Sequence, residues 1–208
     1  MHDRLPPPDQ HLARWLLYLL SRDRLRDLDR FLMVPIFRLG LGWLIGGPLQ
    51  GWMMVLRTHG RRTGRARYVA LDYVLDDGSV YCLAGFGRTT HWFLNLLHEP
   101  GVKVMLPGRT FVGTAEQVTD ADERARVVPR LVRACGLPGF VIGGNPWTMD
   151  DAAMLAAVEG IPLVRIRPTG LVAGPADPGG LLWLFKVGAA ALLVRRLVRR
   201  GSPSARGS

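Results

Sequence analysis

Hydrophobic and polar residues alternate through the middle of the chain, which is typical of half-buried β-strands. The alternation is clearest from Arg67 to Leu75, where every second residue, from Val69 onward, is a large apolar one. One face of this strand is therefore apolar, and the other is smaller and more polar. Comparable runs predict six strands in all, at Trp52–Thr58, Arg67–Leu75, Ser79–Gly85, Val102–Leu106, Thr110–Val118 and Ile161–Arg167.

Turn and capping residues separate these strands and predict helices between them. Asp77-Gly78 and Pro107-Gly108 are turn signals that join neighbouring strands as hairpins. Threonine or aspartate caps predict helices at Thr90–His98, at Asp120–Cys135 with Glu123 in the capping-box position, and from Thr148 with Asp151 onward. Because the strands come as hairpins rather than βαβ units, we predict an α+β fold. Its mostly antiparallel sheet of about six strands closes into a small barrel, with helices outside.

Apolar arms flank this central region. Helical spacing of apolar residues begins at Leu12, and a second apolar run, broken by Pro35, follows. This arm is predicted either to pack on the domain or to lie on an anionic membrane surface. At 181–194 an apolar run precedes four arginines, and we expect it to lie in a membrane interface or to dock on a partner. The predicted divisions are an N-terminal helical arm at 1–50, a barrel domain at 51–170, and a C-terminal helix and tail at 171–208.

The chain is strongly basic. Its net charge is +10, from 27 Lys and Arg against 17 Asp and Glu. Such an excess attracts a phosphorylated ligand, an acidic membrane or nucleic acid. Because no recognised nucleic-acid module accompanies the arginines, we expect no nucleic-acid partner.

Other chemistry is not visible in the sequence. Cys82 and Cys135 lack metal-ligand spacing, and there is no catalytic triad, so we assign neither a metal nor a catalytic residue. The first ten residues lack the apolar core of a secretory signal. We therefore expect a cytoplasmic protein, or one that is peripheral on the inner face of the cell membrane.

Positive charge is concentrated between two predicted strands, in a segment that we call the arginine turn (residues 57–67). It places five arginines around Gly60 and Gly64, namely Arg57, Arg61, Arg62, Arg65 and Arg67. Guanidinium groups are rigid, always charged donors, and a glycine-rich turn can direct backbone N–H groups to the same point. The segment therefore predicts a site for an anionic ligand, although a merely solvated turn is the structural alternative.

Three motifs in order give the central region a family resemblance. They are L-x-T-x-G-R-x-T-G-x-x-R, formed by Leu56, Thr58, Gly60, Arg61, Thr63, Gly64 and Arg67; W-F-L-N-L at Trp92–Leu96; and I-P-L-V at Ile161–Val164. From about Trp52 to Thr169 the chain resembles the deazaflavin (coenzyme F-420)-dependent nitroreductase family. The resemblance implies a split β-barrel oxidoreductase.

The resemblance also implies a cofactor and its binding residues. Coenzyme F-420 is expected, with FMN as the alternative, and a hydride would pass from the reduced deazaflavin to a small quinone-like or nitroaromatic acceptor. Contacts to the anionic part are expected from Arg61, Arg62, Thr63, Gly64 and Arg67. The ring is expected to lie against Val69, Ala70, Ala84, Gly85, Phe86 and Gly87, and the helix that closes the groove to carry His91, Trp92 and Asn95.

This chain departs from the family near the ring and near the acceptor. Relatives place a small polar residue near the ring, whereas here Gly85 is followed by Phe86. Relatives that reduce nitro compounds also carry tyrosines in the segment that corresponds to 136–159. This chain has none there and offers Phe140 and Trp147 as candidate substrate contacts. Cofactor binding therefore transfers better than the acceptor or the proton donor.

Alternative interpretations remain open. His91 could be a solvent-exposed helix start, Trp92 a core residue, and Asn95 a side chain that ties a loop backbone. A non-catalytic module that binds flavin, deazaflavin or lipid at the membrane surface is the alternative function. Because family barrels of this type often pair, we also consider a homodimer.

Overall fold

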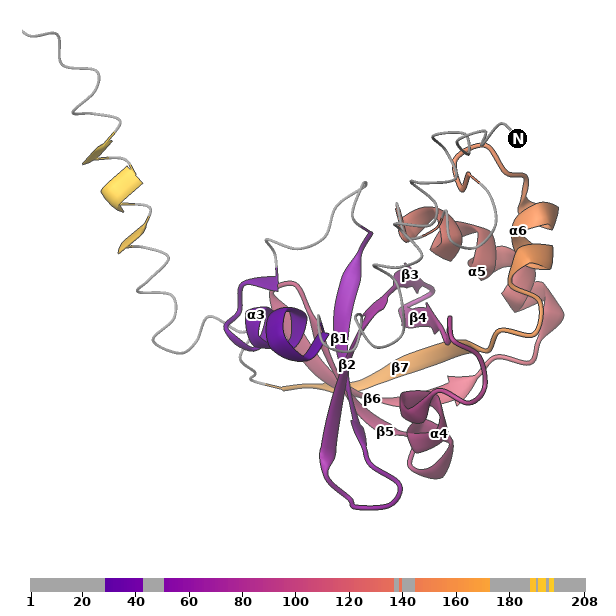
Figure 1. Cartoon of the computed structure of the whole chain (residues 1–208), viewed down its shortest axis with the longest axis horizontal. Helices are drawn as coiled ribbons and strands as arrows, with labels where there is room; N and C mark the ends of the chain where they lie inside the picture. The colour runs from indigo at the N-terminus through magenta and orange to yellow at the C-terminus, as the bar shows by residue number, and fades with distance from the viewer. Residues whose placement is uncertain are drawn as a thin grey trace, which may run out of the picture.

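The protein folds around one curled sheet with helices on its outer surface (Figure 1). The computed structural model describes residues 29–42, 51–136, 139 and 145–172, and helical pieces at 188–189, 191–193 and 195–196. Its strands are β1 (Met53–His59), β2 (Ala66–Asp72), β3 (Val74–Asp76), β4 (Ser79–Leu83), β5 (Gly101–Leu106), β6 (Arg109–Gln117) and β7 (Leu163–Leu171). The predicted α+β split β-barrel is confirmed.

The sheet has seven strands in the order β2-β1-β5-β6-β7-β4-β3, and every neighbouring pair is antiparallel. The prediction of one strand over Arg67–Leu75 was wrong, because that segment divides at Tyr73. The backbone N–H of Tyr73 still donates to the carbonyl of Trp52 at 2.9 Å, in register with β1 and β2, whereas the next residues, Val74–Asp76, pair with β4. The two halves, β2 and β3, thus lie at opposite edges of the sheet although only one residue separates them. The sheet must curl round for the chain to join them, which produces the barrel.

Helices form where the caps predicted them, with differences in the cap contacts. The helices of the central region are α4 (His91–His98), α5 (Ala121–Ala134) and α6 (Asp151–Ala157). Asp120 caps α5 by accepting from the Glu123 N–H at 2.6 Å, whereas α6 is capped by Asp150 rather than by Thr148. Thr90 occupies the cap position of α4, but its hydroxyl donates to the carbonyl of Gly87 instead.

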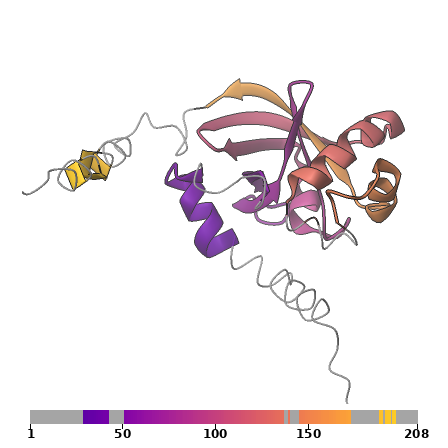
Figure 2. The same ribbon diagram turned by 90° about the horizontal axis from the view of Figure 1, so that it is seen from above.

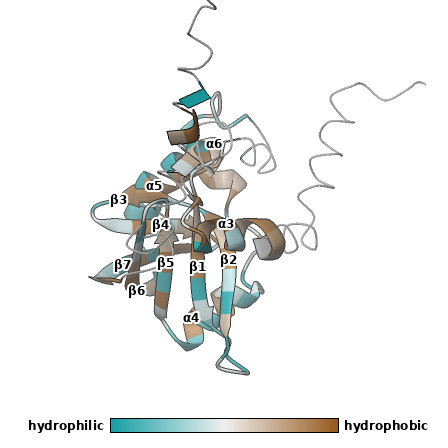
Figure 3. Ribbon diagram, turned by 90° about the vertical axis from the view of Figure 1, so that its left-hand side faces the viewer, coloured by the Kyte–Doolittle hydropathy of each residue, from teal (hydrophilic) through white to brown (hydrophobic). Residues whose placement is uncertain are grey.

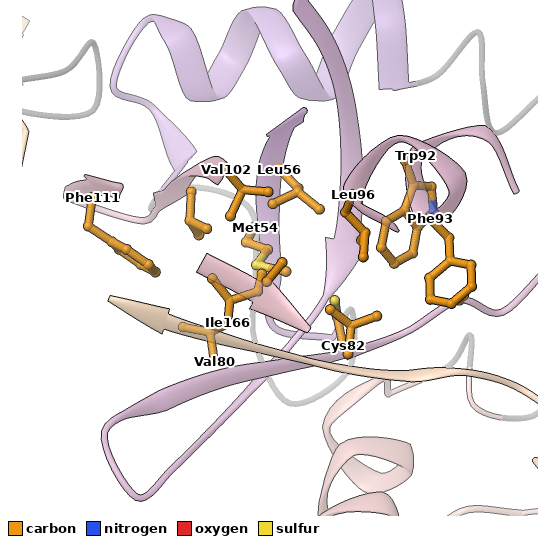
Figure 4. Packing of buried hydrophobic residues seen from close by; sticks show 14 residues of the cluster. Met54, Leu56, Val80, Cys82, Trp92, Phe93, Leu96, Val102, Phe111 and Ile166 are labelled. Atoms are coloured by element: carbon orange, nitrogen blue, oxygen red, sulfur yellow. The ribbon is translucent and has the colours of Figure 1, made fainter. Parts of the chain in front are cut away.

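Alternate residues of the strands pack into the barrel interior. Met54 and Leu56 of β1 and Cys82 of β4 meet Trp92 and Phe93 of α4 there, all of them buried (Figure 4). The two aromatic rings meet edge to face, 6.1 Å apart. Burying a side chain of this size contributes about 1.5–3 kcal/mol to folding. Helix α4 thus acts as a plug that is fixed against the sheet by its apolar face.

The outer surface of the sheet carries two further hydrophobic clusters. Helices α5 and α6 cover Tyr81 and Leu163 on one side. On the other, the π-helical turn η1 (Asp29–Met33) leads into α3 (Val34–Arg38), and buried Phe37 packs with Val55 of β1. Figure 2 shows α3 and α6 at opposite ends of the sheet. Residues 29–42 of the predicted N-terminal arm therefore pack on the barrel; residues 1–28 and 43–50 lie outside the described residues.

The described residues include no membrane-spanning helix. Within the described residues, each helix is too short or too polar to cross a bilayer. Most of the predicted C-terminal arm lies outside them, and its described pieces, such as Leu192 and Leu193, are helical and exposed. Membrane contact therefore stays a prediction.

Candidate cofactor-binding site

The arginine turn closes the hairpin of β1 and β2 at one end of the barrel, where the ribbon in Figure 3 has the colour of hydrophilic residues. The N–H of Gly60 donates to the carbonyl of Arg65 at 2.9 Å, and those of Thr63 and Gly64 donate back to the carbonyl of Gly60 at 3.0 and 2.7 Å. Gly64 has φ +64°, a left-handed conformation that favours glycine. The glycines of the motif are therefore required by the turn itself.

The guanidinium groups of this turn are not neutralised by neighbouring acids. Arg62, Arg65 and Arg67 are exposed and Arg61 is half-buried. Among the described residues, none of the four lies within ion-pair distance of a carboxylate. Four uncompensated positive charges within seven residues make an electropositive end suited to an anion.

One side chain of α4 holds the turn in place. The Oδ1 of Asn95 accepts from the backbone N–H of Arg61 at 3.1 Å and from its Nη1 at 3.4 Å. Its Nδ2 donates to the hydroxyl of Thr58 at 3.3 Å. Asn95 is 4% exposed and Thr58 is fully buried. The interpretation of Asn95 as a residue that ties a loop backbone is therefore confirmed.

His91 lies beside the same guanidinium. Its Nδ1 is 3.5 Å from the Nη1 of Arg61, and its side chain is exposed at the start of α4. A second contact joins the last residue of β1 to the residue that follows α4. The Nδ1 of His59 lies 2.7 Å from the Oε1 of Glu99. Sequence reasoning missed both the Thr58 hydroxyl and this pair. Thr58 was part of the sequence motif, whereas no local signal in the sequence indicates the pair of His59 and Glu99.

The loop after β4 carries four further residues that were predicted to bind the cofactor. Ala84 is buried, whereas Gly85 and Phe86 are exposed. Gly87, at φ +80°, donates its N–H to the carbonyl of Ala84 at 2.6 Å. A Cβ placed on Gly85 or Gly87 would meet no atom within 4 Å. The loop thus leaves open space above its glycines. Together with the donor set of the arginine turn, the residues present fit a group with a flat ring and an anionic tail.

Two predicted ring-lining residues lie on different faces of β2. Val69 pairs with Leu56 and packs toward the barrel interior, on the same side of the strand as Arg67. Ala70 packs against the outer cluster around Phe37. Its side chain therefore does not share the face of Val69, because successive residues of a strand point to opposite sides.

The structure places one aromatic residue of the closing helix and one of the predicted substrate segment. Trp92 is 7% exposed and packs in the core, so its interpretation as a core residue is confirmed. Trp147 is 49% exposed, and its backbone N–H donates to the Oδ1 of Asn145 at 3.0 Å. Phe140 lies outside the described residues. Substrate contact by either residue stays a prediction.

Thiol and metal chemistry find no support in the described residues. Burial raises the pKa of the Cys82 thiol to about 12, and burial also raises that of Cys135, so both stay protonated near neutral pH. No group of three acidic, histidine or cysteine side chains with metal-binding geometry occurs in the described part of the chain.

A hollow of about 540 Å³ lies elsewhere, beside β3, β4, α5 and β7. Several residues in and beside this hollow are joined by hydrogen bonds and ion pairs, and we call them the Glu123 network (Tyr81, Glu116, Glu123, Arg165 and Arg167). The Oε1 of Glu123 accepts from the Tyr81 hydroxyl at 2.7 Å and from the Nη1 of Arg165 at 2.7 Å. Burial, aided by that hydrogen bond, raises the pKa of Tyr81. Glu123 was predicted to complete a capping box, but its carboxylate is engaged in this network instead. Since the cations here already have anionic partners, we do not place the ligand in this hollow.

Parts of this chain are similar to a known protein family and to several solved structures. Residues 33–136 match the family model described as F420H(2)-dependent quinone reductase. Among solved structures, an F-420-H2-dependent reductase (FDR-A) is 22% identical over 55% of this chain and 93% of its own, with a TM-score of 0.42. The heme storage protein HutZ from Vibrio cholerae is 16% identical over 68% and 92%, with a TM-score of 0.43. A conserved hypothetical protein from Mycobacterium tuberculosis is 18% identical over 58% and 74%, with a TM-score of 0.43.

Proposed function

The chain belongs to the F420H(2)-dependent quinone reductase family, and from this membership we propose that it is a reductase of quinone-like or nitroaromatic acceptors that uses reduced coenzyme F-420. The observation that carries the proposal is the arginine turn, whose guanidinium groups have no carboxylate partner among the described residues. When bound, the reduced deazaflavin supplies the hydride, which is chemistry that the protein itself lacks.

The residues of this chain supply binding and orientation. Arg61, fixed by Asn95, is placed to contact a phosphate through its remaining N–H groups, with Thr63 and Gly64 presenting the turn. The exposed Arg62, Arg65 and Arg67 add a positive field that favours an acidic tail. Holding both parts of a ligand in this way fixes the direction of its ring and lowers the entropic cost of reaction.

The glycine loop and β2 are the proposed ring site. Gly85 and Gly87 leave space for a flat group, with Val69 on the interior face of β2 and Ala84 below the loop. Exposed Phe86 would cover the ring and exclude water from it. No side chain among the described residues is assigned as proton donor, and solvent is sufficient to protonate the product.

The proposed organisation follows from these assignments. Residues 51–170 form the cofactor-binding barrel, with the helical segments on either side as arms. Trp147, and Phe140 outside the described residues, are proposed as contacts for the acceptor. Membrane docking by the arms and pairing of two barrels remain part of the proposal, and they are tested by vesicle flotation and sedimentation.

A binding titration with F-420, FMN and FAD side by side tests the proposal. We expect saturable binding of F-420 that is tighter than that of either flavin. Affinity no better than for an unrelated polyanion of equal charge would contradict it. Oxidation of reduced F-420 in the presence of a quinone and nitroaromatic panel then separates a reductase from the non-catalytic alternative, which predicts tight binding without turnover on any acceptor.

A further inference from the structure

The arginine turn contains one fixed guanidinium and several unfixed ones. Arg61 makes hydrogen bonds to Asn95 through both its backbone N–H and its Nη1, whereas the side chains of Arg62, Arg65 and Arg67 are exposed and make no hydrogen bond or ion pair with another described residue. A guanidinium that a neighbouring side chain already holds loses little further freedom when it binds a ligand, whereas a free arginine loses more rotamer entropy. The turn therefore has one oriented arginine, Arg61, whereas the other three contribute only a general positive potential.

The atoms that fix Arg61 are buried and engaged within the protein. The carboxamide of Asn95 has a partner on both sides, Arg61 at its oxygen and the Thr58 hydroxyl at its nitrogen. With an exposed fraction of 4%, Asn95 presents little surface to a bound molecule. A buried amide whose oxygen and nitrogen both have partners within the protein is suited to orienting its neighbours rather than to contacting a ligand.

We propose that Asn95, supported by Thr58, is a positioning residue that sets Arg61 as the specific anion ligand of the turn. Helix α4 carries Asn95 and is itself locked into the barrel core by Phe93 and Leu96. The hydrophobic core, rather than the surface hairpin, therefore fixes the position of the Arg61 guanidinium. This inference rests on the proposed function for the identity of the anion, but the placement of Arg61 stands on the hydrogen bonds alone.

A double-mutant cycle tests the proposal with the full-length protein and F-420. The variants are Arg61→Ala, Asn95→Leu and their combination, with Leu97→Ala on the exposed side of α4 as the matched control. If Asn95 acts through Arg61, each single change weakens binding about tenfold or more, and the combination binds no more weakly than Arg61→Ala. Additive losses would show that Asn95 contacts the cofactor by itself, and would overturn the proposal.

Amide hydrogen exchange supplies a readout that does not depend on the cofactor. The Arg61 N–H is expected to exchange slowly in the unaltered protein and quickly in Asn95→Leu, whereas the Arg62 N–H exchanges quickly in both. Thr58→Val, which removes the hydroxyl but keeps the shape, is expected to loosen Arg61 in part, and Thr58→Ser to restore it. Equal exchange of Arg61 and Arg62 in the unaltered protein would overturn the proposal.

The two experiments separate this inference from the function on which it rests. A protected Arg61 N–H in a protein that does not bind F-420 at all overturns the proposed function and leaves the positioning contact intact. Normal F-420 binding that neither Arg61→Ala nor Asn95→Leu weakens overturns the role of the positioned arginine while the proposed function stands. Thermal unfolding of each variant, compared with Leu97→Ala, confirms that the folded protein is being measured.

Discussion

Two arginine-rich regions of this molecule have opposite surroundings. In the Glu123 network, Arg165 bridges Glu116 and Glu123 at 2.8 and 2.7 Å, and Arg167 reaches Glu116 at 2.7 Å. In the arginine turn, Arg61 has no carboxylate partner among the described residues. The same side chain thus serves stability where its charge is cancelled and remains available to a ligand where it is not. This contrast, rather than the total of +10, locates the proposed site.

The largest expected effect is on stability, in the paired region. Arg165→Met removes the positively charged partner of the nearly buried Glu123 carboxylate, leaves only the Tyr81 hydroxyl, and should lower the free energy of unfolding by about 3 kcal/mol. Urea denaturation measures this, and Arg62→Met in the turn is the matched control, with a change within about 0.5 kcal/mol. An equal loss in both variants would erase the distinction between the two regions.

The second effect is on affinity, in the unpaired region. Arg61→Ala should weaken F-420 binding by about ten- to a hundredfold, since a charge-assisted hydrogen bond contributes about 1.5–3 kcal/mol. Fluorescence titration measures the dissociation constant. Arg167→Ala removes an equal charge from the network as control and should leave that constant nearly unchanged.

The third effect is on salt dependence and concerns the exposed arginines. Arg62→Gln and Arg65→Gln should each reduce affinity by only a few-fold at low ionic strength, with little effect at high ionic strength, because screening shortens the reach of exposed charges. Arg61→Ala should weaken binding at both. Titrations at two salt concentrations distinguish the oriented Arg61 from the exposed arginines. A loss of affinity in Arg62→Gln that is the same at both salt concentrations would contradict this distinction.

The smallest effect is on acid stability. Burial alone would raise the pKa of Asp76, but the guanidinium groups of Arg126 and Arg130 outweigh it and lower that pKa. A lowered folded-state pKa stabilises the protein above the unfolded value, about 3.9, and this contribution is lost as pH falls through the folded value. Asp76→Asn should therefore be less stable than the unaltered protein at pH 6, and the difference should shrink below about pH 4. A constant difference in denaturation across that range would contradict the assignment.

Local patterns in the sequence predicted much of this fold. Period-two alternation and turn pairs placed the strands, and the spacing of Gly60 and Gly64 identified a turn that those residues do form. The division of one predicted strand at Tyr73 was not predicted, because it depends on β2 pairing with β1 and β3 with β4, at opposite edges of the closed sheet.

The candidate site shows the same limit. Motif matching named Arg61 and Asn95, but which atoms meet across 34 positions of chain is decided by the packing of α4. The partner of Glu123 was missed for a related reason. A local capping rule competed with a buried tyrosine and arginine each 42 positions away, and the tertiary contacts prevailed.

The place of β7 in the strand order has a consequence for biosynthesis. It is the last strand of the barrel to leave the ribosome, yet it inserts between β6 and β4, which do not pair with each other. Until Leu171 has emerged, both of those strands keep a row of open backbone donors and acceptors, which is a template for aggregation. We therefore expect a nascent chain that stalls before Leu163 to bind a ribosome-associated chaperone. The hairpin that bears the arginines does not need β7 and can form earlier in synthesis.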